Sequence, residues 1–200
     1  MEIIVVLAHP NNKSFNHAIA GRVVSTLKEN GHSVIFHDLY EEQFDPIMTT
    51  PELEREYELP PGIRPYCEEI KRADGMIFVH PNWFGQFPAI LKGWVDRVFI
   101  PGVVHSVPEK DSIVTEGLLR QMTAIAIVTS HVPMEQELKE FGNPLETIWK
   151  NCIFGFCAVR DASFVFLTSV FESTSDQRVG WLAEIEELVR SKFPRAHSRI

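Results

Sequence analysis

The residues best suited to chemistry stand in two short segments, each directly after an apolar run. The first segment is His9-Pro10-Asn11-Asn12-Lys13-Ser14-Phe15-Asn16, and it leads into an amphipathic stretch. Free backbone N–H groups at the start of such a helix, together with the Ser14 hydroxyl and the Asn16 amide, favour an anion such as phosphate. The simpler interpretation is that Ser14 only caps the helix.

The second segment, Pro81 to Pro88, carries two large aromatic residues, Trp83 and Phe84, beyond a buried run. Flat ligands stack on such rings, and backbone N–H groups beside aromatic walls suit an isoalloxazine ring. The alternative is that both rings pack in the core or at an interface. The sequence contains neither GxGxxG nor GxxxxGK[ST], which disfavours a dinucleotide fold of that type and a nucleoside triphosphatase.

Two strings of residues carry a resemblance to a known family. They are His9-Pro10 followed by Ser14-Phe15-Asn16, and Pro81-Asn82-Trp83-Phe84-Gly85-Gln86-Phe87-Pro88-Ala89-Ile90-Leu91-Lys92-Gly93-Trp94-Val95-Asp96-Arg97-Val98. The sequence resembles the NAD(P)H:quinone oxidoreductases of flavodoxin-like fold. That family includes the modulator-of-drug-activity proteins and the ancillary oxidoreductases of potassium efflux. The resemblance spans most of the chain and is strongest over residues 2–30 and 75–102.

The resemblance implies a bound flavin, with NAD(P)H as co-substrate and a quinone-like acceptor. FMN is slightly preferred as the flavin, and FAD is the alternative. A hydride would pass from NAD(P)H through flavin N5 to the acceptor, and the shared site implies ping-pong kinetics. The phosphate would lie at the first segment, the ring along the second, and the pyrimidine end at the loop after the fourth strand. The implied binding residues are His9, Ser14, Phe15, Asn16, Pro81, Asn82, Trp83, Phe84, Thr129 and Ser130.

The loop after the fourth strand departs from the family pattern. It reads Thr129-Ser130-His131-Val132-Pro133-Met134, where the family has Thr-Thr-Gly-Gly followed by a Tyr and a His. His131 is the candidate catalytic residue, because an imidazole with an unperturbed pKa of about 6.5 can relay a proton or stabilise a reduced ring. The alternative is a loop histidine with no redox role.

The same departure keeps other functions open. One is a flavin-binding regulatory subunit of a membrane potassium-efflux transporter, with little turnover of its own. A one-electron carrier of the flavodoxin type is less favoured, because nothing in the sequence marks a strongly acidic docking face.

The elements that must position these loops alternate between strands and helices. Apolar runs typical of buried parallel strands occupy Glu2–Ala8, Ser33–Leu39, Gly75–His80, Thr123–Ser130 and Ala162–Thr168. Amphipathic periodicity predicts helices over Ser14–Asn30, Arg64–Ala73, Pro88–Ile100, Asn143–Phe154 and Ser175–Phe193. Gly31 is expected to end the first helix, Pro88 to lie in the first turn of its helix, and Ser175 to cap the last.

This alternation predicts an α/β, flavodoxin-like, doubly wound five-stranded parallel sheet of order 2-1-3-4-5, with helices on both faces. Residues 1–200 are expected to form one domain. Ligands bind such sheets past the carboxyl ends of the strands where the winding reverses, here between the first and third strands. Residues 41–63 and 101–116 read as irregular lids or dimer arms. A homodimer is predicted, because the aromatic loops and the second arm would otherwise expose apolar surface.

Composition excludes several other classes of function. The formal charge of −8 and the scattered Lys and Arg residues disfavour nucleic acid and anionic membranes as partners. No apolar run approaches the roughly 18 residues of a membrane span, and the start lacks the basic flank of a signal peptide, which predicts a cytoplasmic protein. Three cysteines without a CxxC pair predict reduced thiols, two of them in the core. The histidines lack a ligand spacing, so no metal site is expected.

Overall fold

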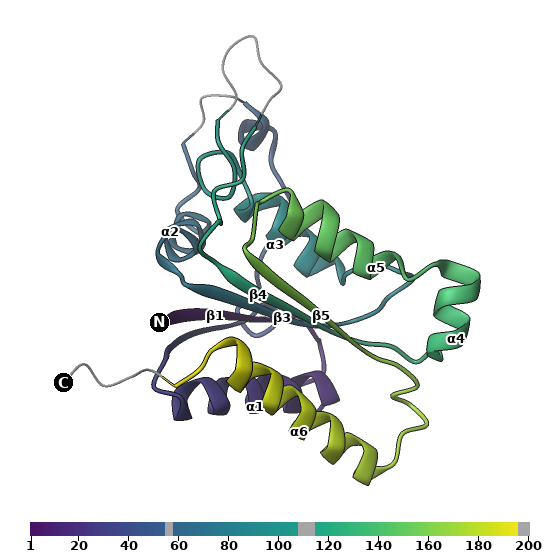
Figure 1. The fold of residues 1–200 in the computed structure, drawn as a ribbon. Helices are drawn as coiled ribbons and strands as arrows, with labels where there is room; N and C mark the ends of the chain where they lie inside the picture. The colour runs from purple at the N-terminus through teal and green to yellow at the C-terminus, as the bar shows by residue number, and fades with distance from the viewer. Residues whose placement is uncertain (55–57, 108–114, 196–200) are drawn as a thin grey trace, which may run out of the picture.

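One parallel sheet organises the protein (Figure 1), and its strand order is the predicted one. The computed structural model describes residues 1–54, 58–107 and 115–195. In the sheet, neighbouring strands pair parallel in the order β2-β1-β3-β4-β5. The strands are β1 Glu2–Leu7, β2 Ser33–Asp38, β3 Gly75–Pro81, β4 Thr123–Thr129 and β5 Asp161–Leu167. Every residue of β3 and β4 is buried, which explains their continuous apolar runs.

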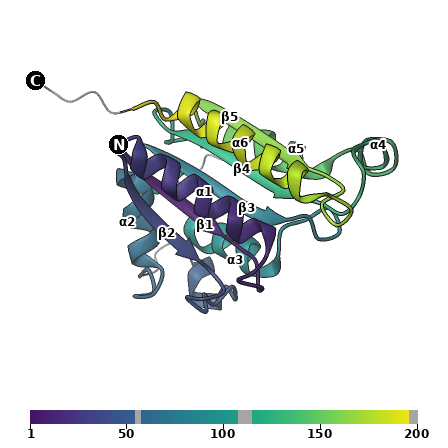
Figure 2. The same cartoon turned by 90° about the horizontal axis from the view of Figure 1, so that it is seen from below.

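Helices cover both faces of this sheet (Figures 1 and 2). On one face lie α1 (Phe15–Glu29) and α6 (Ser175–Lys192), which pack against each other and against alternate strand residues such as Val5 and Ile127. The opposite face carries α2 (Arg64–Arg72), α3 (Ala89–Val98) and a helical run that begins with α5 (Pro144–Thr147). The sheet therefore separates two hydrophobic cores, and its carboxyl edge is left to the loops.

Several predicted helix boundaries need correction. Thr174, not Ser175, caps α6, since its side chain accepts a hydrogen bond from the Gln177 N–H and Gln177 bonds back to the Thr174 N–H. Pro88 is the residue before α3, not part of its first turn. Asn143 likewise precedes α5, in a left-handed conformation, and after Thr147 the helix continues with π-type hydrogen bonding over Ile148–Gly155. By contrast, Ser14 caps α1 and Gly31 follows its end with φ of 82°, as predicted.

One helical segment was not predicted from the sequence. It follows the β4 loop and consists of α4 (Met134–Gln136) and a π-helical turn, Glu137–Phe141. The segment shows no apolar stripe because Glu137 is its one buried residue. Single π turns of this kind often occur at functional sites.

The two irregular stretches are held against the sheet at particular points. Residues 41–63 contain a short 3₁₀ turn, Thr50–Leu53, which is tied to α3 by Arg97. In the stretch 101–116, His105 forms isolated β-bridges with Pro101 and with Gly117, the residue that follows the stretch. Positions 55–57 and 108–114 lie outside the described residues, so the prediction of lids or dimer arms stays a prediction.

Within the described residues, no helix is long and apolar enough to cross a membrane. The predicted cytoplasmic location stays a prediction. Cys67 and Cys157 are buried and Cys152 is exposed, all three as free thiols, as the sequence predicted. Burial raises the pKa of the Cys67 thiol to about 11 and that of Cys157 to about 12, so both behave as apolar packing groups.

Candidate functional site

The loops after β1, β3 and β4 meet at the carboxyl edge of the sheet around two adjoining cavities. The smaller has a volume of about 260 Å³ and the larger about 600 Å³. The β3 and β4 loops are joined by the Asn82 N–H, which donates to the Thr129 carbonyl oxygen over 2.7 Å. Asn82, Trp83, Ser130 and His131 line both cavities, so one ligand could extend from the first into the second.

The smaller cavity collects the residues that the sequence singled out. All of them line it except Phe84, which lines only the larger cavity. The members brought together are His9, Ser14, Phe15, Asn16, Pro81, Asn82, Trp83, Thr129, Ser130 and His131. These positions come from three loops far apart in the chain, and the parallel sheet alone brings them to one place.

The start of α1 lies at one end of this cavity and offers free N–H donors to it. Ser14 is the N-cap, and its Oγ accepts from the His17 N–H over 3.3 Å. The N–H groups of Phe15 and Asn16 have no acceptor within the described part of the chain, so two donors and the helix dipole point outward. The Asn16 side chain turns inward and donates from Nδ2 to Thr129 Oγ1 over 2.9 Å. Both interpretations of Ser14 therefore hold together: it caps the helix and lines the cavity.

A histidine relay supports the Ser14 hydroxyl. His17 Nδ1 lies 2.9 Å from Ser14 Oγ, and its Nε2 lies 2.9 Å from Asp38 Oδ2 at the end of β2. A carboxylate oxygen can only accept a hydrogen bond, so His17 Nε2 carries the hydrogen. In the neutral ring Nδ1 is then the acceptor, and the Ser14 hydroxyl donates to it. The His9 ring packs edge-on near the His17 ring. Partial burial lowers the pKa of His9 and outweighs the contact of Nδ1 with the Asn11 carbonyl oxygen, which raises it. His9 is therefore mainly a neutral hydrogen-bonding group at neutral pH.

Arg178 of α6 adds a permanent positive charge to the same cavity. Its guanidinium donates to Ser173 Oγ over 2.8 Å and to the Val170 carbonyl oxygen over 3.1 Å, and it lies above the Phe15 ring. A guanidinium fixed in this way beside free helix N–H groups suits a phosphate. Sequence reasoning missed Arg178, since an arginine on a surface helix far along the chain carries no signal of its neighbours.

The β3 loop is a tight hairpin that presents its aromatic residues. Trp83 and Gln86 exchange two backbone hydrogen bonds of 3.1 Å around Phe84 and Gly85, whose φ angles are 54° and 71°. A left-handed phenylalanine is strained, and such strain commonly marks a functional loop. The Asn82 Oδ1 stabilises the turn by accepting from the Gly85 N–H over 2.8 Å. The Phe84 side chain is consequently held fully exposed at the mouth of the larger cavity.

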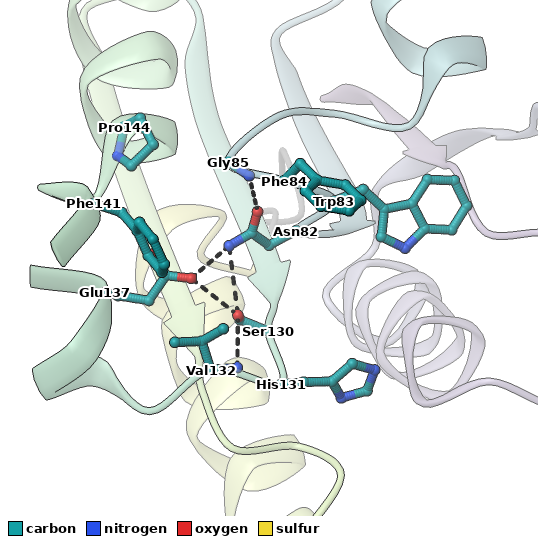
Figure 3. A pocket seen from close by; sticks show the side chains of 10 residues that line it. All are labelled: Asn82, Trp83, Phe84, Gly85, Ser130, His131, Val132, Glu137, Phe141 and Pro144. Carbon is teal, nitrogen blue, oxygen red and sulfur yellow. Dashed lines mark hydrogen bonds between the residues drawn. The ribbon is translucent and has the colours of Figure 1, made fainter.

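The larger cavity has apolar walls and a polar floor (Figure 3). Phe141 and Pro144 line one side and Trp83 the other. On the floor, Glu137 accepts two hydrogen bonds at Oε1, from Asn82 Nδ2 over 2.6 Å and from Ser130 Oγ over 3.2 Å. Glu137 is only 1% exposed. The sequence did not indicate it, because it stands among exposed glutamates in a segment without a periodic pattern.

His131 lies between the two cavities, on the exposed side of the loop. Its ring packs edge-on against Phe171 at a centroid distance of 5.8 Å and points away from Glu137 (Figure 3). It lines both cavities, so it is placed to contact a ligand that spans them. Within the described residues, no group of three or more His, Cys, Asp or Glu side chains is arranged to hold a metal ion.

Comparison with known proteins agrees with this geometry. A family profile described as flavodoxin-like fold matches residues 1–189. A Haemophilus influenzae protein named as an uncharacterized NAD(P)H oxidoreductase is 36% identical over 171 residues, which cover 82% of each chain. The chain belongs to the NAD(P)H:quinone oxidoreductase family of flavodoxin-like fold. Family membership accounts for the strand order and for the three loops that line the cavities.

More distant members of the quinone oxidoreductase family extend the comparison. NAD(P)H dehydrogenase (quinone) 1 of Rattus norvegicus is 27% identical over 211 residues, covering 92% of this chain and 76% of the rat protein. The match to the Cavia porcellus protein of the same name covers 44% of that protein's length.

Solved structures show the same fold. Smu.1420 from Streptococcus mutans superposes with a TM-score of 0.84 and 31% identity, covering 96% of this chain and all of that one. An FMN-dependent NADH-azoreductase from Bacillus anthracis, solved with FMN, has a TM-score of 0.78 at 15% identity, covering 96% and 100% of the two chains. The azoreductase comparison concerns the fold alone.

Proposed function

We propose that the protein is a flavin-dependent NAD(P)H:quinone oxidoreductase with FMN as its cofactor. The observation that carries this proposal is the pair of joined cavities, one with anion donors at its end and the other with aromatic walls. The FMN named for the Bacillus anthracis structure of the same fold supports the choice of cofactor. The names of the Haemophilus and rat relatives support NAD(P)H as the reductant and a quinone as the acceptor.

The residues present fit such a cofactor. The free N–H groups of Phe15 and Asn16 and the Arg178 guanidinium would hold a phosphate beside the Ser14 cap. Trp83 would face the ring, and the Ser130 and His131 loop would bound its polar edge. A bound flavin supplies two-electron hydride chemistry, accepting from NAD(P)H and giving to the acceptor.

The protein's own part is binding, orientation and exclusion of water. Trp83, Phe84, Phe141 and Pro144 form an apolar wall that suits a flat quinone-like ring. His131, on the rim of both cavities, would hold or deliver a proton at its imidazole nitrogen as charge develops on the acceptor. Since a single large cavity adjoins the phosphate end, reductant and acceptor would use it in turn, which predicts ping-pong kinetics.

The primary test is the spectrum of the purified protein and its titration with FMN. We expect a yellow protein, or saturable uptake of FMN, and oxidation of NADPH or NADH that depends on an added quinone. The Arg178→Met variant should weaken FMN binding by roughly tenfold, the scale of one lost hydrogen bond to a charged group. A protein that takes up neither FMN nor FAD in excess would refute the proposal. Tight flavin binding without turnover would instead favour the regulatory-subunit function.

The role of His131 needs a separate variant. His131→Ala should slow reoxidation of the reduced enzyme by quinone by about 10²-fold, the lower range for positioned proton transfer. FMN affinity should change little, because the phosphate donors are elsewhere. An unchanged reoxidation rate would remove His131 from the reaction and leave the enzyme assignment intact.

A further inference from the structure

Glu137 is a buried acid that the reaction described above does not use. Its Oε1 is occupied by Asn82 and Ser130, which are both neutral. Its Oε2 has no hydrogen-bond partner in the described residues. Glu137 is only 1% exposed but lines the larger cavity. The floor of this cavity therefore contains a carboxyl group whose partners in the described residues are both neutral.

The backbone holds this carboxylate in place. The Glu137 N–H donates to the Pro133 carbonyl oxygen over 3.0 Å, and its own carbonyl accepts from the Asn143 N–H over 3.2 Å across the π turn. The neighbouring Glu135 and Glu140 are exposed, so the turn selects one glutamate of the segment for the interior. His131, the other titratable side chain that lines this cavity, points away from Glu137 (Figure 3).

The position of Glu137 relates it to the proposed ring site. Asn82 and Ser130, its direct partners, line both cavities, so a ring that spans the junction would lie next to residues bonded to the carboxylate. A flavin that has accepted a hydride carries one more negative charge than the oxidised ring until it takes up a proton. Between apolar walls that exclude water, a fixed negative charge opposes this added charge strongly.

We propose that Glu137 tunes the proposed flavin site electrostatically: its carboxylate disfavours the reduced ring and thereby lowers the reduction potential of the bound FMN. This inference rests on the proposed function, because it requires bound flavin. A lower potential makes the reduced enzyme a stronger donor to quinones. Glu137 is therefore a tuning residue, distinct from the residues that would touch the phosphate.

The test compares Glu137→Gln with Glu135→Gln as a matched control. Both substitutions remove one negative charge from the same segment, but Glu135 is exposed. Midpoint potentials of the FMN-loaded proteins are measured by equilibration with a reference dye. In Glu137→Gln, the preference for reduced over oxidised FMN should be at least about tenfold greater than in wild type. This change raises the two-electron midpoint potential by about 30 mV. Glu135→Gln should match wild type.

The outcomes separate this inference from the proposed function. If wild type binds FMN and reduces a quinone but Glu137→Gln leaves the potential unchanged or lowers it, only the role of Glu137 is overturned. An equal shift in Glu135→Gln also overturns the role of Glu137, because the change in potential would then come from the net charge of the protein and not from the position of Glu137. If wild type takes up no flavin, both proposals fail. Should Glu137→Gln not fold, Glu137→Ala is expected to show the same upward shift, and Glu137→Asp, which keeps the charge, the wild-type potential.

Discussion

At the scale of single residues, His80 shows how burial decides ionisation. This histidine at the end of β3 is fully buried, with Nδ1–H donating to the Pro81 carbonyl oxygen and Nε2 accepting from Trp149 Nε1–H over 2.9 Å. Burial lowers the pKa of His80 to about 4, from the usual 6.5. The ring is thus a neutral connector between the sheet and the helical run over it.

His80 should make stability depend on pH. The unfolded chain binds a proton at this histidine below pH 6.5 and the folded chain only below about 4, so stability is lost as pH falls between these values. The loss from this group is expected to approach about 3 kcal/mol of unfolding free energy. Urea unfolding at pH 7.5, 6 and 4.5 measures it. His80→Gln, which cannot titrate, should show a shallower decline, and an identical slope would contradict the assignment.

At the scale of elements, the cap of α6 offers a direct comparison of two adjacent residues. Thr174 makes a reciprocal capping box with Gln177, whereas Ser175 is the first helical residue. Thr174→Ala should lower the unfolding free energy by about 1 kcal/mol, and Ser175→Ala by a few tenths at most. Chemical denaturation of both variants is the measurement. A larger loss in Ser175→Ala would mean that the helix begins one residue later.

The segment Phe44 to Leu53 depends on one buried ion pair with α3. Arg97, 7% exposed, donates from Nε to Glu52 Oε1 over 2.8 Å and from Nη1 to the Asp45 carbonyl oxygen over 2.6 Å. The pKa of Glu52 is lowered because the Arg97 and Thr49 hydrogen bonds outweigh the effect of burial. The Arg97–Glu52 pair therefore stabilises the folded state at pH values above the usual carboxyl pKa. This stabilisation is lost as the pH falls and Glu52 becomes protonated.

Breaking this pair should be costly. Arg97→Met leaves the Glu52 carboxylate buried without its partner, and the expected loss is about 3 to 5 kcal/mol of unfolding free energy at pH 7.5. The double variant Arg97→Met with Glu52→Gln should recover part of that loss, because no unpaired charge remains. Denaturant unfolding of the single and double variants provides the test. A single-variant loss below about 1 kcal/mol would show that the segment is held by other contacts.

At the scale of the whole molecule, exposed apolar side chains bear on assembly. Phe84, Phe141, Phe156 and Phe171 are each more than half exposed, and three of them line the two cavities. Large exposed apolar groups commonly mark an interface or a ligand-binding surface. We therefore expect a homodimer, with twice the mass of one chain by light scattering at micromolar concentration. A monomer mass would refute it and leave these side chains to ligand binding.

Much of this architecture could be predicted from the chain alone. Short apolar runs such as Ile3–Ala8 and Met76–Val79, alternating with amphipathic stretches, are typical of strands buried on both faces, so a parallel sheet with helices on both sides could be inferred. The carboxyl edge then had to carry the loops that follow β1, β3 and β4. Local sequence also determined the start of α1 and its glycine stop, because capping depends on residues within one turn.

Only the tertiary structure decided which distant side chains complete the site. Glu137 is one of several glutamates in its segment, and its burial depends on a π turn that turns it toward Asn82 and Ser130. Arg178 lines the smaller cavity because α6, although distant in sequence, packs beside α1. The periodicity of one helix or strand indicates which of its residues are buried. The contacts of Glu137 and Arg178 depend instead on how separate elements pack together, and this packing is determined by side chains throughout the core.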